Sequence, residues 1–190
     1  MKYNQFEVKA TRKELEGQKE QMIEQNKTLK QQRFENTFFQ MLNLHHQIVN
    51  SIDLPHPVNL KSRDCFRYLY ESFYNTMKDR DKSIHFSLEP YLVVYHRNES
   101  DLGHYFRNLY TITKFINNSE EIEKQKYADI LRAQLSSHEL LLLFYNCLSD
   151  YGNQKFKPLV EEYQLLKNIS HKYLVDISHK RAFKSSAFGE

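Results

Sequence analysis

Residues 34–52, FENTFFQMLNLHHQIVNSI, decide the class of fold that this chain adopts. Apolar side chains recur there at intervals of three and four residues, and one histidine falls among them. This spacing is typical of an amphipathic α-helix whose apolar face is buried against other elements. The helix should end near Asp53, because Pro55 and Pro57 cannot continue it. The stripe consists of Phe34, Phe38, Met41, Leu42, His45, Ile48, Val49 and Ile52.

The same helical spacing returns along the rest of the chain. It predicts helices over about residues 63–78, 102–116 and 159–169, the last followed by an irregular tail. Only four glycines and four prolines occur in 190 residues, which argues against a sheet protein rich in tight turns. We therefore expect an all-α fold, a compact multi-helix domain of about six or seven helices with an N-terminal helical, coiled-coil-like arm.

Short polar motifs mark further expected helix starts. A serine or asparagine followed three residues later by glutamate has the spacing of a capping box. A proline in the first turn also favours a helix start, because its missing N–H would be unpaired there anyway. The expected starts are Ser87 with Pro90, Asn118 with Glu121, and Ser136 with Glu139.

Charge and hydropathy limit the partners that this chain can have. The formal net charge is only +3, so nucleic-acid binding is not indicated by charge. The longest apolar run, Leu140–Tyr145, is far shorter than the roughly 20 residues of a spanning helix, and the first 30 residues are polar. We expect a cytoplasmic protein, held at the inner face of the membrane only if a spanning segment precedes this chain. Cys65 and Cys147 should be buried free thiols.

Residues 1–33 form a helical arm of different composition, and residues 34–190 form the helical domain. Apolar residues recur in the arm every seven residues, whereas the positions three residues further on are polar. This is half of a coiled-coil seam, apolar at a and polar at d. Two interpretations follow: an arm that pairs two chains into a homodimer, or a solvated helix. The apolar positions are Val8, Leu15, Met22 and Leu29, and the polar ones are Thr11, Gln18, Gln25 and Gln32.

His45 and His46 are adjacent, and this spacing argues against a metal site. Two ligands on one helix need to be three or four residues apart to face the same ion. We expect His45 to be buried among other helices with a structural hydrogen bond, and we expect no metal and no cofactor.

Arginine and histidine pairs raise the alternative of a nuclease. HEPN ribonucleases, which are also helical, carry an arginine separated from a histidine by a few residues. The closest candidate here is Arg97 with His104, because Asn98 follows the arginine. Catalysis would need a general base and a cation beside the phosphate, contributed by two facing protomers. Two other pairs with similar spacing are Arg80 with His85 and Arg132 with His138.

Four polar residues lie beside apolar helical stripes, and with His45 they form the candidate polar cluster. They are Arg107, Arg132, Glu139 and Asn146. An unpaired charge in such a position would be costly, so we expect at least one of the two arginines to be mostly buried and paired with a carboxylate. One interpretation is an internal network that fixes helix register. The other is a cleft in which a guanidinium group binds an anion such as a phosphate or nucleotide.

Several of these segments resemble the AbiC-like phage abortive infection family. They are residues 35–45, 104–110, 127–146 and 187–189, and the resemblance extends over about residues 33–190. It implies an antiphage defence protein of the abortive infection type, acting as a helical sensor or effector through protein or ligand contacts with phage or host molecules. It implies no defined reaction. The alternative is a HEPN-like, metal-independent ribonuclease toxin. Family members often begin with two membrane-spanning helices, which this chain lacks.

Overall fold

The computed structural model describes the backbone of residues 2–77 and 80–190, and the side chains of residues 7, 9–77 and 80–190. The described chain is predominantly α-helical, as predicted, with one two-stranded hairpin and three short 3₁₀-helices. The α-helices are α1 (Lys2–Ser51), α2 (Arg63–Thr76), α3 (Ile84–Arg97), α4 (Glu99–Asn118), α5 (Lys124–Ala133), α6 (Ser137–Leu148) and α7 (Lys157–Glu162).

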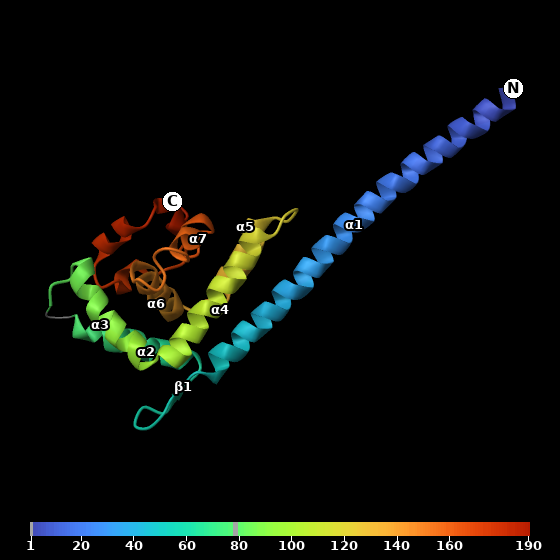
Figure 1. Cartoon of the computed structure of the whole chain (residues 1–190). Helices are drawn as coiled ribbons and strands as arrows, with labels where there is room; N and C mark the ends of the chain where they lie inside the picture. Colours follow the sequence, from blue (N-terminus) through green and yellow to red (C-terminus); the bar gives the residue numbers. More distant parts are fainter. Residues whose placement is uncertain (1, 78–79) are drawn as a thin grey trace.

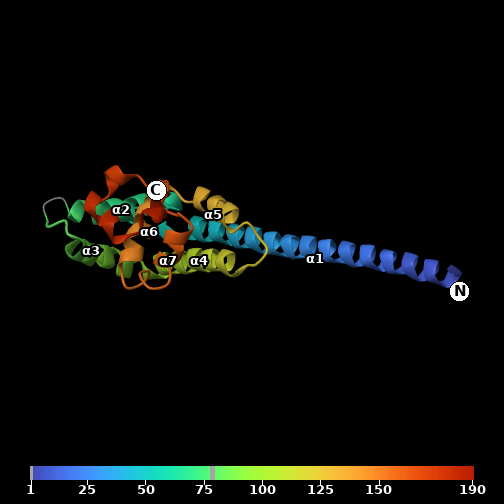
Figure 2. The ribbon, with the colours of Figure 1, turned by 90° about the horizontal axis from the view of Figure 1, so that it is seen from above.

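Helix α1 is continuous through both the arm and the first helix of the domain (Figure 1). Its first part projects away from the other elements, and its last part lies alongside α4 and α5 (Figure 2). Burial begins at Phe34, which is 7% exposed, and continues along the predicted stripe through Ile52. Val8 lies outside the described side chains, whereas Leu15, Met22 and Leu29 are between 49% and 58% exposed.

The end of α1 was predicted correctly. The helix stops at Ser51, and an antiparallel hairpin follows in which β1 (Asp53–Leu54) pairs with β2 (Leu60–Lys61). The carbonyl of Ile52 accepts a hydrogen bond of 2.8 Å from the Ser62 backbone N–H, which closes the hairpin next to the start of α2.

The core forms around α6. Every residue from Leu140 to Cys147 is buried, because α2, α3 and the C-terminal segment cover this helix on different sides. Aromatic rings fill much of this core. The ring centres of Phe73 on α2 and Tyr145 on α6 lie 4.7 Å apart in an edge-to-face arrangement. Cys65 and Cys147 are buried free thiols, as expected.

Two of the three expected helix starts are wrong. Helix α3 begins at Ile84, and Ser87 is buried inside it with Pro90 in its interior. Asn118 is the last residue of α4, and Glu121 has a φ of +60° in the following loop. The Glu121 carboxylate accepts hydrogen bonds from Lys30 on α1 and therefore caps no helix. The loop thus contacts a distant element, which the local spacing of residues does not encode.

The third helix start is confirmed. The Ser136 hydroxyl accepts a hydrogen bond from the Glu139 backbone N–H, and the Glu139 carboxylate accepts one from the Ser136 N–H. This reciprocal capping box opens α6.

The prediction of a long final helix over residues 159–169 is wrong. Helix α7 ends at Glu162, and Gln164 adopts a φ of +54°, which a continuing helix does not allow. The tail is also better ordered than predicted: Leu166 N–H bonds the Ala187 carbonyl at 3.1 Å, and Phe188 is buried. Three 3₁₀-helices occupy the tail: η1 (His171–Tyr173), η2 (Ile177–Ala182) and η3 (Ser185–Phe188).

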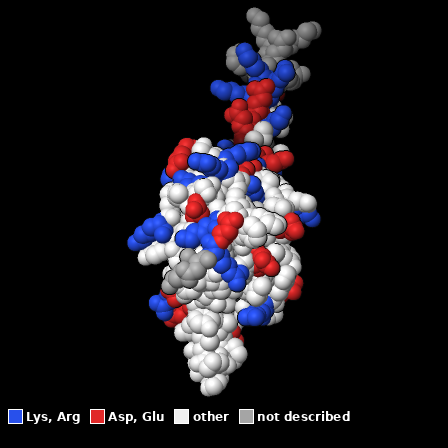
Figure 3. Space-filling view, turned by 90° about the vertical axis from the view of Figure 1, so that its left-hand side faces the viewer, with Lys and Arg blue, Asp and Glu red and all other residues white. Residues whose placement is uncertain are grey.

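No described helix is both long enough and apolar enough to cross a membrane. Acidic and basic side chains are interspersed on the face shown in Figure 3, both on the arm and on the helical domain.

Candidate functional site

Glu139 lies at the junction of three elements of the fold. Its carboxylate is fully buried at the start of α6. Besides closing the capping box, it accepts a 3.0 Å hydrogen bond from the Tyr105 hydroxyl of α4. Its other oxygen lies 3.6 Å from Nε of Arg63, the first residue of α2. A single carboxylate thus links α2, α4 and α6.

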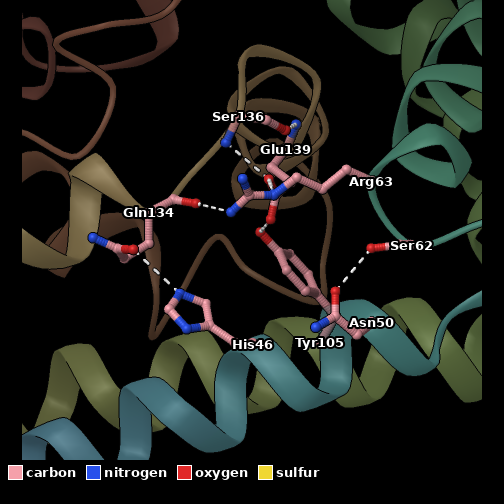
Figure 4. A network of polar contacts seen from close by, with 8 residues as sticks. All are labelled: His46, Asn50, Ser62, Arg63, Tyr105, Gln134, Ser136 and Glu139. Carbon is pink, nitrogen blue, oxygen red and sulfur yellow. Dashed lines mark hydrogen bonds and ion pairs between the residues drawn. The ribbon is translucent and has the colours of Figure 1, made fainter.

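The network continues from Arg63 to α5 and α1 (Figure 4). Nη2 of Arg63 donates a 2.7 Å hydrogen bond to the Gln134 carbonyl. The Gln134 side-chain oxygen lies 3.2 Å from Nε2 of His46 on α1. Arg63 is about half exposed, with a side-chain exposure of 51%, so this edge of the network reaches solvent.

His45 lies next to this network and is fully buried, as predicted. Its ring centre is 5.3 Å from that of Tyr105, and its Nδ1 is 3.2 Å from the Asn108 side-chain oxygen. Burial lowers the pKa of His45, while the nearby Glu139 carboxylate opposes that shift. Burial and Glu139 together hold the pKa of Tyr105 well above its usual range, so its hydroxyl remains a donor.

Arg132 is the mostly buried arginine that the sequence led us to expect. Its side chain is 11% exposed, and Nη1 lies 2.8 Å from the Asp129 carboxylate one turn earlier on α5. The same nitrogen donates to the Gln164 carbonyl at 3.3 Å. Arg132 therefore ties α5 to the turn after α7, and its carboxylate partner is Asp129, not Glu139.

Arg107 and Asn146 lie at a different place, which we call the Arg107 pocket. It has a volume of about 210 Å³ and opens between α3, α4 and the turn after α6. Aromatic side chains form much of its wall, and a glycine, Gly103, lies on its α4 side. The lining residues are Tyr95, Glu99, Gly103, Phe106, Arg107, Tyr110, Asn146, Tyr151, Lys155 and Phe156.

Arg97 and His104, the candidate nuclease pair, are both exposed. Arg97 is the last residue of α3, and His104 lies in the second turn of α4. The described residues include no group of three or more histidine, cysteine or acidic side chains arranged to hold a metal ion.

The structure thus divides the candidate polar cluster into three places. His45 and Glu139 both contact Tyr105. Arg132 pairs with Asp129 on α5, and Arg107 lines the same pocket as Asn146. Sequence reasoning missed Arg63 and Gln134, because no local pattern sets them apart from surface residues. It also missed the aromatic lining of the Arg107 pocket, since those rings read as ordinary core positions.

These features define an all-α protein with a projecting helical arm, a buried carboxylate network and the aromatic, cation-bearing Arg107 pocket. Residues 97–174 match a family model described as "putative phage abortive infection protein". The family resemblance predicted from the sequence is confirmed over this segment, which contains α4, α5, α6 and α7. Arg107, Arg132, Glu139 and Asn146 all lie within it, whereas His45 and Arg63 lie outside it. No curated protein and no solved structure matches the chain.

Proposed function

We propose that this protein acts in antiphage defence of the abortive infection type, as a helical sensor or effector whose arm pairs two copies. The family match over residues 97–174 is the observation that supports the biological role. The geometry of α1 supports the pairing. The proposed occupant of the exposed arm is a second copy of this chain, and the reasons follow from the position and the charge of its side chains.

Three apolar residues of the arm, Leu15, Met22 and Leu29, face away from the helical domain, whereas Ile23 is rotated by only about 20° from Phe34. Successive residues of an α-helix are rotated by about 100°. Relative to Phe34, which faces the domain, Leu15, Met22 and Leu29 are therefore rotated by roughly 100–140°. Their exposure of 49–58% fits this direction. The arm of a second chain can therefore contact these three residues without clashing with the helical domain of the first chain.

The charges beside this apolar stripe favour two parallel arms. With Leu15 at position a, Glu7 and Glu14 occupy g positions, while Arg12 and Lys19 occupy e positions. In a parallel pair, each g residue lies near the e residue of the next heptad on the other chain. Glu7 then meets Arg12 of the second copy, and Glu14 meets its Lys19. An antiparallel pair would instead place e beside e, which brings like charges together.

Glutamine and threonine at the d positions make this a weak coiled coil, because only half of the seam is apolar. We expect dissociation in the range of about 10 μM, which lets concentration or a bound partner control pairing. Such a dimer suits a protein that responds to infection.

The test combines sedimentation with a plaque assay on the full chain. Leu15→Glu with Met22→Glu should abolish self-association and phage protection, because both changes place charges in the seam. Lys13→Glu, on the outer face of the arm, should preserve both. If the Leu15→Glu/Met22→Glu variant is strictly monomeric and still protects against phage, the proposal that protection requires paired arms is wrong. If every variant protects as well as the parent, the arm has no role in defence.

A second activity, a HEPN-like ribonuclease, is favoured by one observation: Arg97 and His104 are both exposed near the junction of α3 and α4. Incubation of the purified protein with total RNA tests this alternative. Cleavage that is lost in His104→Ala supports it, and intact RNA at protective protein concentrations excludes it.

A further inference from the structure

We propose that the Arg107 pocket binds one small organic anion with a flat ring, of the nucleoside monophosphate class. The proposal stands apart from the pairing of the arms, since the pocket lies on α3, α4 and the turn after α6. Four features of the pocket support it: its charge, an unpaired buried amide, its aromatic wall and a glycine that keeps it open.

Within the described part of the chain, the two cations of the pocket form no ion pair with a carboxylate. Among the residues that the structure describes, no acidic side chain lies within ion-pair distance of Arg107 or of Lys155. Glu99 is the one carboxylate in the lining, so the formal charge of the pocket is +1. A guanidinium group binds a phosphate through two parallel hydrogen bonds, and a nearby ammonium group adds charge.

The side chain of Asn146 supplies a buried donor. Asn146 is 2% exposed, and no hydrogen-bond acceptor of good geometry is described for its Nδ2. Burial raises the pKa of Tyr91 well above its usual range, and the nearby Asn146 amide opposes that shift. Among the described residues, the Tyr91 hydroxyl also has no hydrogen-bond partner of good geometry. A buried amide without a partner is costly. Asn146 is one of the lining residues, so a polar ligand atom that reached this amide would satisfy it.

The aromatic wall explains why a ring should accompany the anion. Tyr151 packs against Tyr95 with ring centres 4.3 Å apart, yet remains 49% exposed. The Tyr151 hydroxyl is held 2.9 Å from Nε2 of His96, which fixes the position of the ring. Stacking of a base on such a ring is tolerant of base identity. The volume of about 210 Å³ lies below the usual range of ligand pockets, so only a single small molecule can enter, with part of it outside the pocket.

Gly103 keeps the pocket open. A Cβ atom at this position would lie 3.0 Å from Nη1 of Arg107 and 3.2 Å from the Tyr95 hydroxyl. Alanine would therefore make both groups shift by a few tenths of an ångström and narrow the pocket beside them. Because alanine is also the better helix former, Gly103→Ala should obstruct the pocket while leaving α4 at least as helical.

The test is titration calorimetry on the full chain with AMP, GMP, CMP and UMP, each at up to millimolar concentration. Inorganic phosphate and adenosine serve as the two halves of the ligand. We expect at least one nucleotide to bind, with either half binding about tenfold more weakly or worse. Arg107→Gln and Gly103→Ala should each raise the Kd at least about tenfold. Lys126→Gln removes a cation that does not line the pocket and should leave the Kd unchanged.

The overturning results are equally definite. Absence of binding by all four nucleotides would reject the proposed ligand class. Equal binding of phosphate and nucleotide would reject the role of the aromatic wall. Nucleotide binding that survives both Arg107→Gln and Gly103→Ala would place the site elsewhere. Thermal melting of each variant, measured alongside, confirms that the proteins compared are folded.

Discussion

The hydroxyl of Tyr105 on α4 donates a hydrogen bond to the buried carboxylate of Glu139 on α6, at 3.0 Å. Both side chains are fully buried, and the same carboxylate also caps α6 and faces Arg63. The pair shows how this fold uses polar groups inside an aromatic core. Tyr105 depends on Glu139 for its acceptor, and neither residue lines the Arg107 pocket.

Replacement of Glu139 should therefore destabilise the fold. We expect Glu139→Ala to lower the free energy of unfolding by about 3–5 kcal/mol, because Tyr105 and the Ser136 N–H lose their acceptor. Glu139→Gln retains an acceptor, and Arg63 is half exposed, so a cost of about 1–2 kcal/mol is expected. Urea denaturation measures both values. Lys126→Gln, an exposed control, should change stability by less than about 0.5 kcal/mol. A Glu139→Gln protein that melts like the parent yet fails to protect against phage would argue for a functional carboxylate.

Arg132 and Arg107 should behave differently, although the sequence grouped them. Arg132→Ala removes the partner of Asp129 and of the Gln164 carbonyl, and we expect a loss of about 1–3 kcal/mol. Arg107→Ala removes an exposed side chain and should leave the melting temperature within about one degree. A plaque assay then separates the roles. Protection lost in Arg107→Ala without loss of stability points to the pocket, whereas equal destabilisation by both changes contradicts this division.

Acidification should weaken the fold through His45. Burial lowers its folded-state pKa below the ordinary value of 6.5, so the unfolded chain binds the proton first. The contribution of neutral His45 to the free energy of unfolding is complete above about pH 6.5 and is lost as the pH falls below that value. His138, whose pKa burial also lowers, acts in the same direction. Unfolding free energies measured between pH 7.5 and 5 should therefore decline, and His45→Gln should make the decline shallower. An unchanged slope in His45→Gln would show that other groups cause it.

Two glycines provide a matched pair for packing. A Cβ at Gly152 would lie 2.6 Å from the Asn146 carbonyl oxygen, so Gly152→Ala should cost about 1–3 kcal/mol. A Cβ at Gly17 would meet nothing within 4 Å, and Gly17→Ala should raise the helicity of the arm. Circular dichroism and thermal melting measure both effects. Similar melting of the two variants would contradict the close approach at Gly152.

Charge exchange tests the direction of the paired arms. Glu14→Lys should weaken self-association measured by sedimentation, because it places two cations together in the parallel arrangement. Lys19→Glu in the same chain should restore it, with a coupling of about 0.5 kcal/mol or more per dimer. Restoration should fade at 1 M salt, where charges are screened. If the double variant associates no better than Glu14→Lys alone, the arms are not paired in this register.

Local patterns were enough to predict much of this fold. The spacing of apolar residues predicted α2, the later part of α1 and most of α4, and the Ser136–Glu139 box marked the start of α6. The segment after α7 could not be predicted, because its apolar residues pack against the tail and not along one helical face. Their burial depends on contacts such as that of Leu166 with Ala187, which helical spacing does not encode.

The candidate site was predicted only in part, for a related reason. The sequence showed that Glu139 and Arg132 lie beside apolar stripes, and so that they needed partners. It could not show which partners, because Arg63 and Tyr105 come from other helices and reach Glu139 only after the chain has folded. Asp129, three residues before Arg132 on the same helix, has the spacing of an ordinary surface ion pair, so the sequence does not mark it as the partner of a buried arginine.

The unbroken course of α1 has a mechanical consequence. Fifty helical residues span about 75 Å, and no proline and no glycine interrupts them after Gly17. The helix is then a stiff lever whose far end is built into the aromatic core through Phe34 and Phe38. A torque or displacement applied to the arm is transmitted to the domain, because no helix-breaking residue between Gly17 and the domain provides a hinge. Any event that aligns two such levers also sets the distance and the angle between the two domains at their other end.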